Sequence, residues 1–127
     1  MTENEIAKQI VDAAYRVHIA LGPGLLESVY EAAMVHELAN RGLSTERQKP
    51  IPVMYQGTRI EIGFRASLIV EDKVIAEMKS VETLAPVHKK QLLTYLRLAD
   101  KRLGLLVNFN VELIKDGIKR IANNMPI

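Results

Sequence analysis

Glu77 and Lys79 lie two residues apart in Val74–Val81, a short and otherwise apolar stretch. The alternation of a β-strand predicts that both side chains project from one face of that stretch. Because an acid and a lysine are costly to bury without partners, they need a reason to be there. One reason is metal-assisted phosphodiester hydrolysis, in which Glu77 holds a hard divalent cation and Lys79 positions or deprotonates the attacking water. The other is an ion pair on a solvent-facing strand.

A partner strand must hold this pair in place, and the residues just before it supply one. Arg65–Val70 is an apolar strand, and Glu71–Lys73 is a short polar turn. If Val70 pairs with Val74, then Ser67 lies directly opposite Glu77 on the same face. The predicted hairpin therefore places a hydroxyl beside the carboxylate.

Two helices are predicted before this hairpin. Thr2 and Glu5 have the spacing of a capping box, and apolar residues then recur at helical intervals up to Leu21. A break at Gly22–Gly24 separates this helix from a second one, which begins near Leu26 and ends before Gly42.

Strands and one more helix are predicted for the rest of the chain. Proline at positions 50 and 52 excludes a helix, so 51–55 is predicted as an edge strand that turns at 56–57 into a second strand, 60–64. Pro86 can begin a third helix, on which Gln91 and Tyr95 share a face. Residues 103–109 form a buried strand, and a turn at 116–117 predicts a terminal hairpin of 111–114 with 118–121.

Length and composition indicate one domain, residues 1–127, of the α/β class, with a central mixed β-sheet flanked by helices. The absence of Cys excludes disulfides and thiolate metal sites and fits a cytoplasmic location. No apolar run approaches the roughly 18 residues of a membrane span, so no membrane partner is expected. The sequence has no phosphate-binding glycine loop, and nothing in it indicates an organic cofactor or a nucleophilic triad. A net charge of +2 is too small to indicate nucleic-acid binding by itself.

The order and spacing of several motifs resemble those of the GxxExxY proteins, small bacterial and archaeal relatives of the PD-(D/E)XK nuclease superfamily. The signature itself is matched by Gly24-Leu25-Leu26-Glu27-Ser28-Val29-Tyr30. The other matches extend over nearly the whole chain: Leu21–Gly24, Gly63–Arg65, Glu77–Lys79, Gln91–Tyr95, Gly104–Phe109 and Gly117–Arg120.

This resemblance implies a restriction-endonuclease-like core and the roles of five residues. Glu27 is similar to the acid contributed by an early helix, Glu77 to the metal-binding acid of the (D/E)XK motif, and Lys79 to its catalytic lysine. Gln91 and Tyr95 are similar to the Gln-x-x-x-Tyr motif of the RecB-like branch, which helps hold the nucleic-acid strand. The implied cofactor is Mg²⁺ or Mn²⁺, and the implied substrate is DNA or RNA.

One position departs from the pattern. The first metal-binding Asp of the superfamily falls two residues after Arg65, where this chain has Ser67. A neutral serine oxygen cannot supply the missing charge, so the metal site, Glu77 with Glu27 and Ser67, is predicted to be weakened and catalysis weakened or lost.

Three functions follow as alternatives. The first is a metal-dependent nuclease, active or crippled. The second is a non-catalytic nucleic-acid-binding module, whose affinity would fall steeply with salt. The third is a protein-interaction domain, including a homodimer, for which the prolines at positions 50 and 52 argue against pairing through that edge. The second rests on a basic set around the third helix and the C-terminal hairpin: Lys89, Lys90, Arg97, Lys101, Arg102, Lys115, Lys119 and Arg120.

Overall fold

The chain begins with two helices that pack on each other, α1 (Glu3–Leu21) and α2 (Glu27–Asn40). A computed structural model describes residues 1–125. The Thr2 hydroxyl accepts a hydrogen bond from the backbone N–H of Glu5, and the Glu5 carboxylate accepts one from the N–H of Thr2. The predicted capping box is therefore confirmed. At Gly22, a backbone φ of 72° ends the first helix in a conformation that suits glycine.

Five strands form one sheet in the order β1-β2-β3-β4-β5. The strands are β1 (Thr45–Tyr55), β2 (Thr58–Val70), β3 (Val74–Lys79), β4 (Leu103–Asn108) and β5 (Ile118–Ala122). All neighbours are antiparallel except β3 and β4, whose parallel pairing requires a crossover, here made by α3 (Pro86–Ala99). The predicted α/β class with a mixed central sheet is confirmed.

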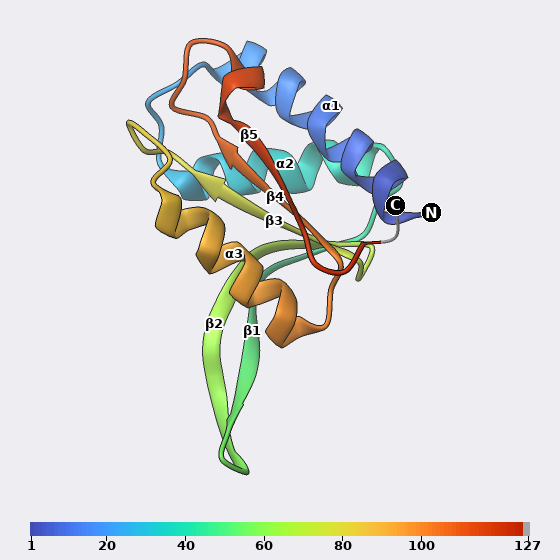
Figure 1. Ribbon diagram of the computed structural model, residues 1–127. Helices are drawn as coiled ribbons and strands as arrows, with labels where there is room; N and C mark the ends of the chain where they lie inside the picture. The colour runs from blue at the N-terminus through green and yellow to red at the C-terminus, as the bar shows by residue number, and fades with distance from the viewer. Residues whose placement is uncertain (126–127) are drawn as a thin grey trace.

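Figure 1 shows α1 and α2 on one face of the sheet and α3 on the other, and the sheet separates two apolar cores. One face carries Val74, Ala76 and Met78 of β3 and packs against α1 and α2. The other face carries Ile75 and packs against α3. Glu77 therefore belongs to the face that α3 covers, in agreement with the predicted alternation.

The first two strands are longer than the sequence pattern predicts, and their outer parts leave the sheet. Val70 pairs with Val74, as predicted, but the pairing of β2 with β3 covers only Leu68–Val70. Beyond that point β1 and β2 continue together as a two-stranded arm that projects below α3 in Figure 1. The divergence of β2 from β3 opens the sheet beside Glu77.

The predicted terminal hairpin is wrong. Residues 111–113 form no strand, Ile114–Gly117 is a 3₁₀ turn, and β5 pairs with β4 instead. Ile114 is buried in the core on the α1 side, and the carbonyl oxygen of Val111 lies 2.8 Å from the His18 ring nitrogen Nε2. Tertiary burial of this segment against α1 thus outweighs the local alternation that suggested a hairpin. Within residues 1–125, no helix is long and apolar enough to cross a membrane.

Candidate active site

Ser67 and Glu77 meet where β2 and β3 separate. The last backbone pair joins Leu68 to Ala76, and at the next position side-chain bonds replace the ladder. The Ser67 N–H donates to Glu77 Oε1 over 3.1 Å, and its hydroxyl donates to Oε2 over 2.9 Å. Both residues are buried. The predicted juxtaposition is confirmed, and one serine satisfies both oxygens of the carboxylate.

The ladder is also interrupted on the other side of Ser67, at Gln48 of β1. Arg47 pairs with Leu68 and Lys49 pairs with Ala66, but the position between them has no ladder pair. Gln48 has a φ of 53°, which is uncommon for a residue other than glycine. Its amide nitrogen Nε2 donates to Glu31 Oε2 over 2.7 Å. This local backbone conformation thus accompanies a contact between β1 and α2.

Glu31 is a second buried acid of this region, and sequence reasoning missed it. Its Oε1 accepts a hydrogen bond from Arg47 Nε at 2.9 Å, while another nitrogen of the same guanidinium donates to the carbonyl oxygen of Ser28. A signal was present, because Glu31 stands three residues before Met34 and seven before Leu38, on the apolar face of α2. An acid at such a position requires a buried partner.

Burial raises the pKa of the Glu77 carboxyl, and the negative charge of Glu31 raises it further. The hydrogen bonds from Ser67 and the positive charge of Lys79 act in the opposite direction without cancelling the effect of burial. Glu77 and Glu31 are therefore electrostatically coupled. Lys79, the source of that positive charge, is partly buried at the end of β3.

Tyr95 of α3 packs against β2 in this region. Its ring stacks on Phe64 of β2 with centroids 3.9 Å apart and planes 2° from parallel. Burial raises the pKa of the Tyr95 hydroxyl, and the charge of Glu77 adds to the effect. Gln91, one turn earlier on α3, is exposed.

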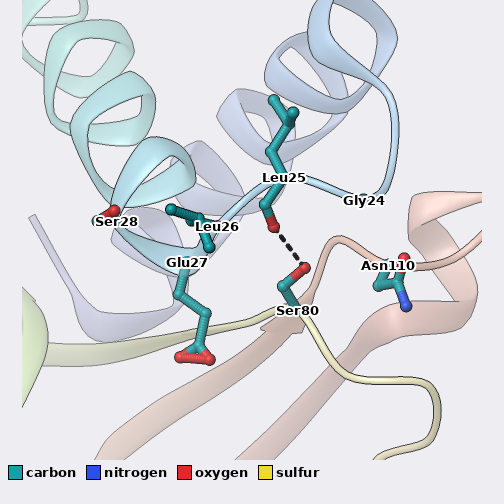
Figure 2. Close-up of a pocket in the computed structure, with 7 residues that line it drawn as sticks. All are labelled: Gly24, Leu25, Leu26, Glu27, Ser28, Ser80 and Asn110. Carbon is teal, nitrogen blue, oxygen red and sulfur yellow. Dashed lines mark hydrogen bonds between the residues drawn. The ribbon is translucent and has the colours of Figure 1, made fainter.

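Glu27 is the first residue of α2 and lines a neighbouring pocket of about 540 Å³ (Figure 2). Ser80, which follows β3, lines the same pocket and donates a hydrogen bond from its hydroxyl to the Leu25 carbonyl oxygen over 2.7 Å. Asn110 lies on the far side of the pocket. Glu27 is partly buried, and the direct contact between Ser67 and Glu77 does not include it.

The donor set does not match a divalent metal centre. No three His, Asp or Glu side chains among residues 1–125 are placed to hold an ion. Ser67 contributes only a neutral oxygen, and Glu31 already accepts bonds from Arg47 and Gln48. Oxygen ligands of Mg²⁺ normally include one or two carboxylates that are free to bind it.

Comparison with known proteins gives one match. The model of the PD-(D/E)XK nuclease superfamily matches residues 4–121. The chain belongs to the PD-(D/E)XK nuclease superfamily. A search of curated proteins and a search of solved structures gave no match. The match extends from α1 to β5 and so includes both buried glutamates, Ser67, Lys79 and Tyr95.

The basic side chains of this PD-(D/E)XK domain differ in their availability. Lys101 Nζ bonds to the carboxylate and carbonyl oxygens of Asp72, and Arg120 bonds to Asn4. The other members of the basic set are exposed. These are three residues of α3 and three beyond it: Lys89, Lys90, Arg97, Arg102, Lys115 and Lys119.

Proposed function

We propose that this protein binds nucleic acid on a nuclease scaffold and that its hydrolytic centre is silenced at Ser67. Its superfamily is one of nucleases, whose members generally act with divalent metal ions on nucleic acid. The proposal gives Glu77 and Lys79 the (D/E)XK positions and gives Ser67 the position of the missing first acid. Membership of the superfamily thus supports nucleic acid as the ligand, and serine at position 67 in place of an acid accounts for the loss of hydrolysis.

The contact between Ser67 and Glu77 is the observation that carries this proposal. A metal-assisted hydrolysis needs negative charge to hold the cation that activates water. Here the carboxylate faces a hydroxyl and an amide N–H, both of which donate to it. Burial also raises the pKa of Glu77, which favours its uncharged form and weakens the attraction for a cation further.

The finer assignments belong to the same proposal. We infer that this is a GxxExxY protein from a bacterium or an archaeon and that it is cytoplasmic. In this inference Glu27 is the acid that an early helix contributes to the site. Gln91 and Tyr95 would hold the nucleic-acid strand as in the RecB-like branch, and the stacking of Tyr95 on Phe64 supports a fixed position for that tyrosine. The cation of an active form would be Mg²⁺ or Mn²⁺.

A cleavage assay tests the catalytic half of the proposal. The native chain, Lys79→Ala, Ser67→Asp and the double variant Ser67→Asp/Lys79→Ala are incubated with Mg²⁺ or Mn²⁺ on single- and double-stranded DNA and RNA. The proposal predicts cleavage by Ser67→Asp alone. Cleavage by the native chain that Lys79→Ala abolishes would contradict silencing, and no cleavage by any form would contradict a latent centre.

A salt titration tests the binding half. Phosphate contacts release counterions, so the affinity of the native chain for DNA or RNA should fall linearly on a logarithmic scale as salt rises. Lys89→Gln/Lys90→Gln should reduce the slope, whereas Lys101→Gln should change it less because Asp72 already engages Lys101. A salt-independent affinity, or no affinity, would favour the protein-interaction alternative.

A further inference from the structure

The outer half of β2, Thr58–Arg65, is an open strand edge. Among residues 1–125, β2 pairs with β3 only at Leu68–Val70, so from Arg65 outward the only partner strand is β1. The arm projects away from the helices (Figure 1). A lone two-stranded hairpin is marginally stable in water, and its free edge carries unpaired backbone donors and acceptors. This part of the arm is therefore suited to pairing with another strand.

The two edges of the arm are not equivalent. The outer edge of β1 carries Pro50 and Pro52, which lack an N–H and discourage pairing. The sequence of β2 over this span, Thr-Arg-Ile-Glu-Ile-Gly-Phe-Arg, contains no proline. Ile60 and Ile62 are respectively 47% and 52% exposed in it. The apolar and unprotected edge is thus that of β2.

The charges on this edge are self-complementary. Arg59 and Glu61 flank Ile60, and the Arg59 Nε lies 3.0 Å from Glu61 Oε1 on the same strand. When two copies of β2 pair antiparallel about a twofold axis at Ile60, Arg59 of each copy stands opposite Glu61 of the other. Ile60 then faces its own counterpart, and Thr58 faces Ile62. Opposite charges directly across a strand pair stabilise it, and a twofold axis applies each contact twice.

We propose that the protein forms a homodimer in which the outer halves of two β2 strands pair antiparallel about Ile60. The partner is a second copy of this chain, because the charge pattern around Ile60 matches itself. The mixed charges of this segment, with a glutamate between two arginines, favour that partner over a uniformly negative nucleic acid. The dimer would join the arms of two domains and continue each two-stranded arm into a four-stranded sheet.

Charge-reversal variants test the pairing directly. Arg59→Glu places two acids opposite two acids across the axis, and Glu61→Arg places two arginines opposite two arginines. Each single variant should weaken dimerisation at least about tenfold, because both symmetric contacts turn from attractive to repulsive. A mixture of the two should associate as a heterodimer, since every acid then faces an arginine. The double variant Arg59→Glu/Glu61→Arg should dimerise like the native chain and keeps the ion pair within the strand.

Sedimentation velocity over a concentration series measures these states. Hydrogen exchange of the peptide covering 57–65 provides a second readout, because dimerisation should slow exchange there as concentration rises. A native chain that stays monomeric throughout, or single variants that dimerise as well as the native chain, would overturn the proposal. Slower exchange at 57–65 that requires added DNA or RNA would also overturn it and would assign the arm to nucleic acid. Cleavage by Ser67→Asp is measured separately, so either proposal can fail alone.

Discussion

Glu31 and Glu77 are two buried acids, and the charge of Glu31 helps to raise the pKa of Glu77, but the fold gives them different partners. Glu31 accepts bonds from a guanidinium and an amide, Arg47 and Gln48. Glu77 accepts two bonds from the uncharged Ser67. The guanidinium of Arg47 bonds directly to the first acid, whereas the charge of Lys79 acts on the second without cancelling the effect of burial, so the pKa of Glu77 stays raised.

This difference explains why a centre with two acids does not amount to a metal site. A cation needs carboxylates that are ionised and available. Glu31 is already engaged by Arg47 and Gln48, whereas burial disfavours the charged form of Glu77. An aspartate at position 67 would change the situation of Glu77, because two adjacent negative charges would favour the binding of a cation between them.

Removing the positive partner of Glu31 should have the largest effect. Arg47→Met keeps much of the aliphatic stem and leaves Glu31 with the amide of Gln48 alone. We expect the free energy of unfolding to fall by about 2 kcal/mol, less than for a fully buried pair because the Arg47 side chain is 41% exposed. Urea denaturation measures the change. Arg97→Met, an exposed arginine on α3, is the matched control, and an equal loss in both variants would show that the ion pair contributes nothing.

Neutralising each acid in turn should have the second largest effect, and the two variants should differ in their free energy of unfolding. Glu31→Gln removes one partner of an ion pair and should cost about 1–2 kcal/mol near pH 8. Glu77→Gln keeps a carbonyl oxygen for the Ser67 N–H and removes a charge that burial disfavours, so stability should be unchanged or increased. Urea denaturation of the two variants side by side gives the comparison. Equal losses would show that Glu77 is as well compensated as Glu31.

The raised pKa of Glu77 should determine the direction in which the free energy of unfolding changes with pH. The folded protein keeps the Glu77 proton to a higher pH than the unfolded chain does. Between pH 4.5, the ordinary pKa of this group, and its raised pKa, the folded state therefore binds more protons than the unfolded state. The free energy of unfolding should therefore fall as pH rises from that value to the raised one in the folded state, and level off beyond it. Subtracting the pH profile of Glu77→Gln isolates this group. A difference that grows in favour of the native chain with rising pH would reverse the assigned direction.

Deleting the serine hydroxyl should have the smallest effect. Ser67→Ala removes one hydrogen bond to Glu77 and keeps the backbone N–H, so we expect a loss of about 1 kcal/mol. The same variant should raise the pKa of Glu77 further, because the hydroxyl lowers it. Carboxyl NMR titration measures that shift. A lower pKa in Ser67→Ala would contradict the role given to the hydroxyl.

Much of this region could be predicted from local pattern. Alternation in β3 placed Glu77 and Lys79 on one face, and the short turn after Val70 fixed the register that brings Ser67 to Glu77. Pro86 and the apolar spacing after it indicated α3, and Gln91 and Tyr95 with it. These features depend on neighbours in sequence, which explains their success.

Features that depend on distant contacts could not be predicted in the same way. The start of β1 has no apolar alternation, so the sequence does not predict a strand at Arg47 and Gln48. Their contacts with Glu31 join β1 to α2, which are distant in the sequence. The 3₁₀ turn at Ile114–Gly117 follows from burial against α1 and not from its own sequence. The roles of Glu27, Gln91 and Tyr95 toward nucleic acid stay predictions.

Calorimetric titration of Mn²⁺ tests the central claim, that Ser67 withholds the charge a metal needs. The titration compares the native chain, Ser67→Asp and Ser67→Asp/Glu77→Gln without nucleic acid. We predict one bound ion for Ser67→Asp, little or no binding by the native chain, and loss of binding in the double variant. Binding by the native chain as tight as that of Ser67→Asp would contradict the claim.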